Sequence, residues 1–280
     1  MLTVMAPAKL NLTLEVLGKR PDGLHEIRSI IQSVDLCDTL RFENGEQVSF
    51  KCDMKGWTAE ASLVSKAVGL LGEVAGGSRG ALITIIKRIP LVSGLGGDSS
   101  DAAAVLRGLN ELWGLELPRR ELLKIEAQLG SDVFFFMEGG TALVEGRGEK
   151  ITPLPSPAKM WVVLVVPDVP VKEGKTESMY AGLKKGHFTD GAITKIMAST
   201  ILKGDVFTPP MLFNTFENIV FNDDTLKTYK EHILKLGAPH VHLAGSGPTL
   251  FTLFNDKPAA EELFNKCKRQ GMKVYLVSTL

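Results

Sequence analysis

The chain has 280 residues, 44% of them hydrophobic and 23% charged, which is typical of a globular protein of one large or two modest domains. Its 32 basic and 32 acidic side chains balance, which excludes the strong positive charge typical of proteins that bind nucleic acids or acidic membranes. The three cysteines form no Cys-x-x-Cys pair, and no signal peptide or membrane-spanning apolar run is found. We expect a cytoplasmic monomer or weak homodimer without nucleic-acid or membrane partners.

The first predicted element is a strand near the N-terminus. Apolar side chains at each even position from 10 to 16 alternate with polar ones, a period of two that indicates a strand. Lys9 and Asn11 therefore share the opposite face. A Pro-Asp-Gly turn follows, and then a second predicted strand over residues 27–43.

The middle of the chain alternates between strand and helix patterns. We predict a helix over residues 59–74, a strand over 81–90, and helices over 102–114 and 118–130, each helix carrying apolar residues at three- and four-residue spacing. The sequence of residues 132–151, which includes Phe-Phe-Phe, predicts strands and turns. A nearly all-apolar run over 159–168 predicts a buried strand.

The C-terminal half contains predicted helices near residues 178–183, 222–236 and 259–269, and predicted strands over 240–247, 249–256 and 272–278. Helices and strands alternate without a strict βαβ rhythm, which indicates an α+β fold. The residues SPAK at 156–159, at the start of the buried strand, predict a boundary between two domains, 1–156 and 157–280.

The stretch PLVSGLGGDSS, residues 90–100, places flexible glycines directly before a predicted helix. Such a loop brings backbone amides and the positive end of the helix dipole together, which suits an anion such as phosphate. It is not a Walker A loop, because it has no lysine, nor a dinucleotide fingerprint, because Ser99 replaces the last glycine. A tight turn without a ligand remains an alternative from these residues alone.

Asp98 is an unexpected acid within this glycine-rich loop. Its carboxylate could cap the following helix, with Asp101 as a further acid in the first turn, or it could help to hold a metal ion. Helix N-termini favour such acids, and a good cap contributes about 0.5–2 kcal/mol. We expect the cap on its own helix to be the role of Asp98.

Three motifs in order resemble those of the GHMP kinase superfamily: PAKLNLTLEV, PLVSGLGGDSSDAAA and LAGSGPTLF. Three further stretches and the total length are similar to one family within it, the 4-diphosphocytidyl-2-C-methyl-D-erythritol kinases: RPDGLHEIRSIIQSVDLCDTL, GSDVFFF and GGTALVEGRGE. The resemblance covers nearly the whole chain. It implies an N-terminal ATP-binding domain like domain 2 of ribosomal protein S5 and a ferredoxin-like C-terminal domain.

The resemblance also implies the reaction. A family member transfers the γ-phosphoryl group of ATP, with Mg²⁺, to the 2-hydroxyl of the cytidine diphosphate methylerythritol substrate, in the non-mevalonate isoprenoid pathway. The catalytic lysine falls on Lys9 and the catalytic aspartate on Asp132. A carboxylate that accepts the hydroxyl proton and a nearby ammonium that stabilises charge suit this chemistry. The residues alone favour simpler roles, a surface lysine on a strand and a turn or helix-end aspartate.

The resemblance assigns binding roles to two further sets of residues. The nucleotide is expected to contact residues near its base and in the glycine-rich loop: Ser62, Lys87, Pro90, Leu91, Val92, Ser93, Gly94, Leu95, Gly96, Gly97, Asp98, Ser99 and Ser100. Ser99 is also the expected protein ligand of Mg²⁺. The substrate is expected to contact Asn11 near the transferred group, His25 and Tyr180 at the cytosine, and Leu24, Thr176 and Gly245.

The chain departs from the family's pattern at three positions. Leu24 replaces the usual tyrosine, Ser62 the usual asparagine, and Asp98 the usual glycine. Loss of base stacking at Leu24 would cost roughly 1–3 kcal/mol of binding. Two other functions remain open: a kinase for another small alcohol, of the homoserine or mevalonate type, and a catalytically silent nucleotide-binding module.

Overall fold

The computed structural model describes residues 1–77, 79–170, 174–222 and 224–280. The chain packs into two compact units, each built from several stretches of sequence. Unit 1 contains residues 1–8, 36–91 and 96–139, and unit 2 contains residues 9–35, 92–95 and 140–280. Strands β1 (Leu2–Lys19) and β2 (His25–Asn44) contribute one part to each unit.

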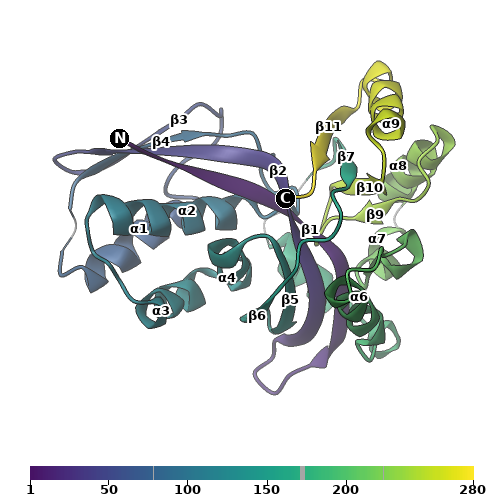
Figure 1. Ribbon diagram of the computed structural model, residues 1–280, viewed down its shortest axis with the longest axis horizontal. Helices are drawn as coiled ribbons and strands as arrows, with labels where there is room; N and C mark the ends of the chain where they lie inside the picture. Colours follow the sequence, from purple (N-terminus) through teal and green to yellow (C-terminus); the bar gives the residue numbers. More distant parts are fainter. Residues whose placement is uncertain (78, 171–173, 223) are drawn as a thin grey trace. The chain divides into compact units, whose positions relative to one another are not determined.

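Unit 1 is a sheet covered on one face by helices (Figure 1). Beside its parts of β1 and β2 it contains β3 (Val48–Cys52), β4 (Ala81–Ile86), α1 (Leu63–Val74), α2 (Gly97–Leu112), α3 (Arg119–Leu129) and α4 (Ser131–Glu138). β4 lies between β2 and β3, antiparallel to β2 and parallel to β3. Phe42 of β2 packs against Gly108 of α2, where a Cβ would lie 2.4 Å from the ring. The glycine therefore lets α2 approach the sheet closely.

Helix α4 corrects the prediction of strands and turns directly after Gly130. Three consecutive phenylalanines favour a strand locally, yet Phe134, Phe135 and Phe136 are all buried in a helix. A short helix can bury so much of its circumference only when other elements surround it, and tertiary packing then overrides local propensity. Arg107 of α2 donates a 2.5 Å hydrogen bond to the Phe136 carbonyl near the end of this helix.

Unit 2 contains the rest of β1 and β2 and most of the C-terminal half. Its other elements are β5 (Thr141–Gly146), β6 (Lys150–Leu154), β7 (Trp161–Val166), α5 (Lys175–Ala181), η1 (Lys185–His187), α6 (Ala192–Leu202), η2 (Pro209–Met211), β8 (Phe213–Asn214), α7 (Glu217–Val220), α8 (Asp224–Lys235), β9 (His242–Leu243), β10 (Leu250–Phe254), α9 (Lys257–Arg269) and β11 (Lys273–Ser278). β5 pairs with β2, and β8 pairs in parallel with β1. The other predicted helices and strands are found near their expected positions, whereas β3, α6, β8 and α7 have no counterpart in the sequence prediction.

A second sheet of unit 2 has the strand order β11-β7-β10-β9. β7 is its buried central strand, as its apolar run predicts, and it pairs antiparallel with both neighbours. Val163 and Val165 of this strand belong to one apolar core with Ile233 of α8 and Leu263 of α9. Burial of these side chains stabilises the unit by roughly 1.5–3 kcal/mol each.

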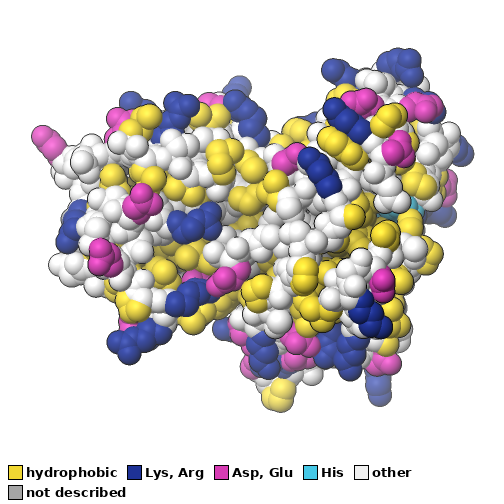
Figure 2. Space-filling model, viewed as in Figure 1, with side chains coloured by type: hydrophobic (Ala, Val, Ile, Leu, Met, Phe, Trp, Pro, Cys, Tyr) yellow, Lys and Arg dark blue, Asp and Glu magenta, His cyan; other side chains and the backbone are white. Residues whose placement is uncertain are grey.

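Surface charge agrees with the balanced composition. On the face shown in Figure 2, Lys and Arg side chains are interspersed with Asp and Glu. Among the residues that the structure describes, no helix has both the length and the apolar character required to cross a membrane.

Candidate functional site

In unit 1, the glycine-rich loop runs into the N-terminus of α2. Gly96, with a left-handed φ of 76°, precedes the helix, and the Ser100 amide donates back to the Gly96 carbonyl at 2.9 Å. The amides of Gly97, Asp98 and Ser99 come before this bond and have no acceptor within the helix. A Cβ on Gly97 would lie 2.9 Å from Ile89 Cγ2, so only glycine fits there without displacing Ile89. This local geometry suits an anion.

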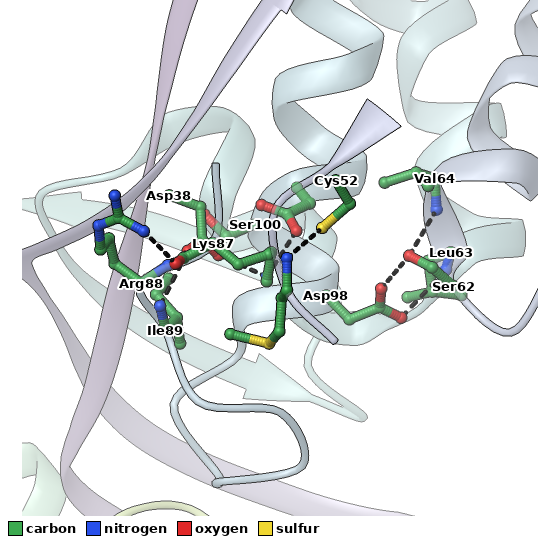
Figure 3. Close-up of polar contacts among 12 residues, drawn as sticks. Asp38, Cys52, Ser62, Leu63, Val64, Lys87, Arg88, Ile89, Asp98 and Ser100 are labelled. Atoms are coloured by element: carbon green, nitrogen blue, oxygen red, sulfur yellow. Dashed lines mark hydrogen bonds and ion pairs between the residues drawn. The ribbon is translucent and has the colours of Figure 1, made fainter. Parts of the chain in front are cut away.

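Asp98 does not cap its own helix, which corrects the sequence prediction. Its carboxylate accepts hydrogen bonds from the Ser62 hydroxyl and, at 3.0 Å, from the Leu63 amide, at the N-terminus of α1 (Figure 3). Ser62 is the N-cap residue of α1, and its hydroxyl also accepts from the Val64 amide at 3.3 Å. Asp98 therefore supports the cap of a neighbouring helix.

We expect Asp98→Ala to lower the free energy of unfolding by about 0.5–2 kcal/mol, because the Leu63 amide and Ser62 hydroxyl lose their acceptor. Urea unfolding measures this change, and the affinity for ATP should stay nearly unchanged. Asp98→Asn keeps one carbonyl acceptor and serves as the milder control. Unchanged stability with a large loss of affinity for Mg²⁺-ATP would instead support a metal-binding role.

Lys87 lies in a buried cluster with Asp38 and Asp101, here called the Lys87 cluster. Its Nζ donates to Asp38 Oδ2 at 2.5 Å and to Asp101 Oδ2 at 2.7 Å, and all three side chains are at most 1% exposed. Asp38 Oδ1 also accepts from the Ile89 amide at 2.8 Å, on the segment that enters the glycine-rich loop (Figure 3). The cluster therefore fixes the start of the loop, and contact of Lys87 or Ser62 with a nucleotide base stays a prediction.

The Lys87 cluster holds one ammonium between two carboxylates. Burial lowers the pKa of Lys87, but the two carboxylates outweigh it and raise that pKa overall. Burial raises the pKa of Asp101, and Asp38 contributes in the same direction, whereas the Lys87 ammonium lowers it. The two buried carboxylates therefore share the single Lys87 ammonium as their countercharge.

The other residues of unit 1 with predicted roles differ in their burial and hydrogen bonds. The Ser100 hydroxyl donates to the Pro7 carbonyl at 2.7 Å, so its proton is already used within the protein. Ser99 is half-buried, Pro90 is buried and Leu91 is exposed. Asp132 is half-buried in the first turn of α4, at the helix end where a carboxylate is favoured.

In unit 2, Lys9 and Asn11 share one face of β1, as strand periodicity predicts. Lys9 is only 5% exposed, and its Nζ donates to Asn11 Oδ1 at 2.8 Å. Asn11 Nδ2 in turn donates to Ser29 Oγ at 2.9 Å, and Ser29 Oγ donates to the Thr13 carbonyl at 2.5 Å. This chain of hydrogen bonds orients the lysine. Ser29 was not predicted, because it lies on the next strand and has no local motif.

The two glycine-rich motifs meet through their backbones in unit 2. A Cβ on Gly94, whose φ is +84°, would lie 2.3 Å from the Ala244 carbonyl oxygen and 2.9 Å from the Gly247 amide nitrogen. A Cβ on Gly245 would lie 3.3 Å from Lys9 Nζ. The sequence LAGSGPTLF therefore forms a glycine turn beside the Lys9 ammonium. Here we call residues 244–247 the second glycine loop.

We expect Gly94→Ala to destabilise the protein by about 2–4 kcal/mol, since it adds backbone strain to an overlap with the Ala244 carbonyl. Gly18→Ala, in the same unit, is the matched control, because its new Cβ meets no atom within 4 Å and its φ is not positive. Thermal unfolding of both variants measures the difference. Equal stability of the two would contradict the close packing of the loops.

Asn214 is a buried residue of unit 2 that sequence reasoning missed. Its Nδ2 donates to the carbonyls of Leu243 at 2.9 Å and Gly245 at 2.8 Å, and its Oδ1 accepts from the Phe216 amide at 3.0 Å. Its amide group therefore holds the backbone of β9, of the second glycine loop and of the turn that follows Asn214. No sequence motif distinguishes it from other asparagines.

The residues predicted to read cytosine also gather in unit 2. The rings of His25 and Tyr180 stack with centroids 4.9 Å apart, and Phe188 meets His25 edge-on at 6.1 Å. Burial, with a smaller effect of Lys19, lowers the pKa of His25, which favours a neutral ring that both donates and accepts. Leu24 beside it is 44% exposed. The Thr176 and Ser246 hydroxyls are 2.9 Å apart, which joins α5 to the second glycine loop.

Remaining loop residues belong to unit 2 as well. Ser93 and Leu95 are buried, and the carbonyl of Leu95 accepts from the Lys9 amide at 2.9 Å. Val92 is 63% exposed and adopts a positive φ of 50°, which is strained for a β-branched residue. Strain of this kind is concentrated at functional sites.

Comparisons with known proteins show the family to which the chain belongs. Residues 62–140 match the model of the GHMP kinases N terminal domain, and residues 223–273 match that of the GHMP kinases C terminal. A 4-diphosphocytidyl-2-C-methyl-D-erythritol kinase of Dehalococcoides mccartyi is 52% identical over 100% of this chain and 99% of its own. That of Enterococcus faecalis is 41% identical over 98% of each chain.

A solved structure supports the same assignment. The crystal structure of a 4-(cytidine 5'-diphospho)-2C-methyl-D-erythritol kinase matches with a TM-score of 0.83 and 29% identity, over 99% of both chains. The fold is thus the mixed α+β fold of GHMP kinases, as predicted. Full-length identity above 50% and the shared fold lead to one conclusion: the chain belongs to the 4-diphosphocytidyl-2-C-methyl-D-erythritol kinase family of the GHMP kinases.

Proposed function

We propose that this chain uses ATP to phosphorylate the 2-hydroxyl of 4-diphosphocytidyl-2-C-methyl-D-erythritol, giving the 2-phosphate and ADP in the non-mevalonate isoprenoid pathway. The observation that carries the proposal is the 52% identity over the full chain to a kinase of that name. The buried Lys9, held by Asn11 and lying beside Gly245, supports it from the geometry of unit 2.

We assign phosphate binding to the N-terminus of α2. The amides of Gly97, Asp98 and Ser99 would donate to phosphate oxygens, and the helix dipole would favour the negative charge. Among the described residues, no group of three or more His, Cys, Asp and Glu side chains is placed to hold a metal ion. Mg²⁺ would therefore take most of its ligands from phosphate and water, as it commonly does, with the Ser99 hydroxyl as the protein ligand.

We assign the chemistry to Asp132 and Lys9. The Asp132 carboxylate would accept the proton of the 2-hydroxyl as that oxygen forms its bond to phosphorus. The Lys9 ammonium, oriented by Asn11, would stabilise negative charge on the reacting oxygens. ATP supplies the phosphoryl group, and the protein contributes mainly orientation and charge, because the transition state of phosphoryl transfer is largely dissociative.

We assign recognition of the cytosine to His25 and Tyr180. A neutral His25 ring can donate to one group on the base edge and accept from another. Tyr180 offers an aromatic surface for stacking, while Leu24 replaces the second aromatic surface by an apolar contact. Thr176 would hydrogen-bond the substrate from beside Ser246.

An ATP-consumption assay with three acceptor alcohols tests the proposal. The cytidyl substrate should be phosphorylated, and homoserine and mevalonate should not. Turnover of homoserine or mevalonate without turnover of the cytidyl substrate would reassign the acceptor. ATP binding without turnover of any alcohol would indicate a catalytically silent module.

A further inference from the structure

Lys175, in the first turn of α5, carries a buried ammonium that has no hydrogen-bond partner in the described part of the chain. Burial of the group lowers its pKa to about 8. A buried charge without a partner is costly, and proteins usually pair such groups. An anion that reached this ammonium would give it a partner.

The surroundings of Lys175 belong to the elements that we assign to the substrate. A Cβ on Gly247 would lie 3.3 Å from Lys175 Nζ, so the ammonium rests against the second glycine loop. The next residue, Thr176, contacts Ser246 of the same loop. Tyr180, near the end of the same helix, stacks on His25.

The order of contacts along the second glycine loop parallels the order of groups in the proposed substrate. Gly245 lies beside Lys9, where the reacting hydroxyl is expected, and Gly247 lies beside Lys175. Tyr180 and His25 are the residues expected to contact the cytosine at the other end of the substrate. In 4-diphosphocytidyl-2-C-methyl-D-erythritol the diphosphate connects the cytidine to the erythritol. An anion is thus expected between the two ends of the substrate. Lys175 lies beside the same glycine loop as Lys9 and on the same helix as Tyr180, so its ammonium is near elements assigned to both ends.

We propose that Lys175 binds the diphosphate of the substrate, its flexible side chain turning from its buried position to pair with phosphate oxygens. This inference rests on the proposed function. The lysine side chain has a flexible four-carbon stem, which allows the ammonium to move while the backbone stays fixed. The Lys175 ammonium then leaves a position without a partner and forms charge-assisted hydrogen bonds to phosphate oxygens.

Lys175→Met tests the proposal, because methionine keeps an unbranched apolar stem without the charge. The matched control is Lys185→Met, which removes an exposed lysine from the nearby η1 turn. Binding of cytidine 5'-diphosphate and of cytidine is measured by calorimetry, together with turnover of the full substrate. Melting temperatures are measured without ligand.

We expect Lys175→Met to weaken binding of cytidine 5'-diphosphate by about 10–100-fold, the range of a charge-assisted hydrogen bond. Binding of cytidine should change less than about twofold on the same argument, and the melting temperature should stay equal or rise, since an unpaired buried charge is removed. KM for the substrate should rise with the loss of diphosphate affinity, and Lys185→Met should match wild type throughout.

Three results would overturn the inference: unchanged affinity for the diphosphate, equal losses for cytidine and its diphosphate, or a lowered melting temperature with unchanged KM. The last would make Lys175 a structural residue. Failure of the proposed function is distinguishable, because wild type would then not turn over the cytidyl substrate at all. Wild-type turnover combined with a Lys175→Met variant of normal KM overturns only the role of Lys175.

Discussion

Asp132→Asn is expected to reduce kcat by about 10²–10⁴-fold, the usual contribution of a positioned general base. The amide has nearly the same shape as the carboxylate but does not accept the hydroxyl proton. Asp132 lies in the first turn of α4, where the variant keeps a polar group at the helix N-terminus. Affinity for ATP and the melting temperature should therefore change little.

Steady-state kinetics with the cytidyl substrate and ATP measure this effect. Glu138→Gln is the matched control, since it neutralises an exposed carboxylate at the other end of the same helix. Its kcat should equal that of the wild type. A kcat near the wild-type value for Asp132→Asn would refute the assignment of the base.

Lys87→Met is expected to lower the free energy of unfolding by about 3–5 kcal/mol, the usual cost of removing one partner from a buried ion pair. The variant leaves the buried carboxylates of Asp38 and Asp101 together without their cation. Because Asp38 also holds the Ile89 amide, the start of the glycine-rich loop should lose order as well.

Urea unfolding of a double-mutant cycle measures this coupling. Asp101→Asn neutralises one carboxylate, so the pair Lys87→Met and Asp101→Asn should cost less than the sum of the two single changes. Additive costs would contradict a shared cluster. If Lys87 instead served the nucleotide base alone, Lys87→Met would raise KM for ATP without changing stability.

Local patterns in the sequence predicted much of the fold and part of the site. Strand periodicity placed Lys9 and Asn11 on one face, and their hydrogen bond confirms it. The three ordered motifs gave the GHMP family and fold, which the comparisons confirm. Roles of individual site residues, the boundary at residue 156, the cytoplasmic location and the monomer or weak homodimer stay predictions.

Features that depend on distant partners could not be predicted in this way. Asp98 has the sequence of a cap for its own helix, but its hydrogen-bond partners lie more than 30 residues earlier, at the start of α1. The burial of Phe135 and its neighbours in α4 follows from tertiary packing, whereas their propensity favours a strand. Lys87 contacts Asp38 only in the folded protein, because Asp38 precedes it by 49 residues.

Unit 2 is assembled from three separate stretches of chain, residues 9–35, 92–95 and 140–280. Recombination between relatives can therefore separate residues that pack together. A chimaera joined at residue 156 would combine Gly94 and Lys9 of one parent with the second glycine loop of another. Contacts between backbones survive such an exchange only if both parents follow the same main-chain path. A donor of the C-terminal half should therefore also supply residues 9–35 and 92–95, so that the inherited block is contiguous in space although it is divided in sequence.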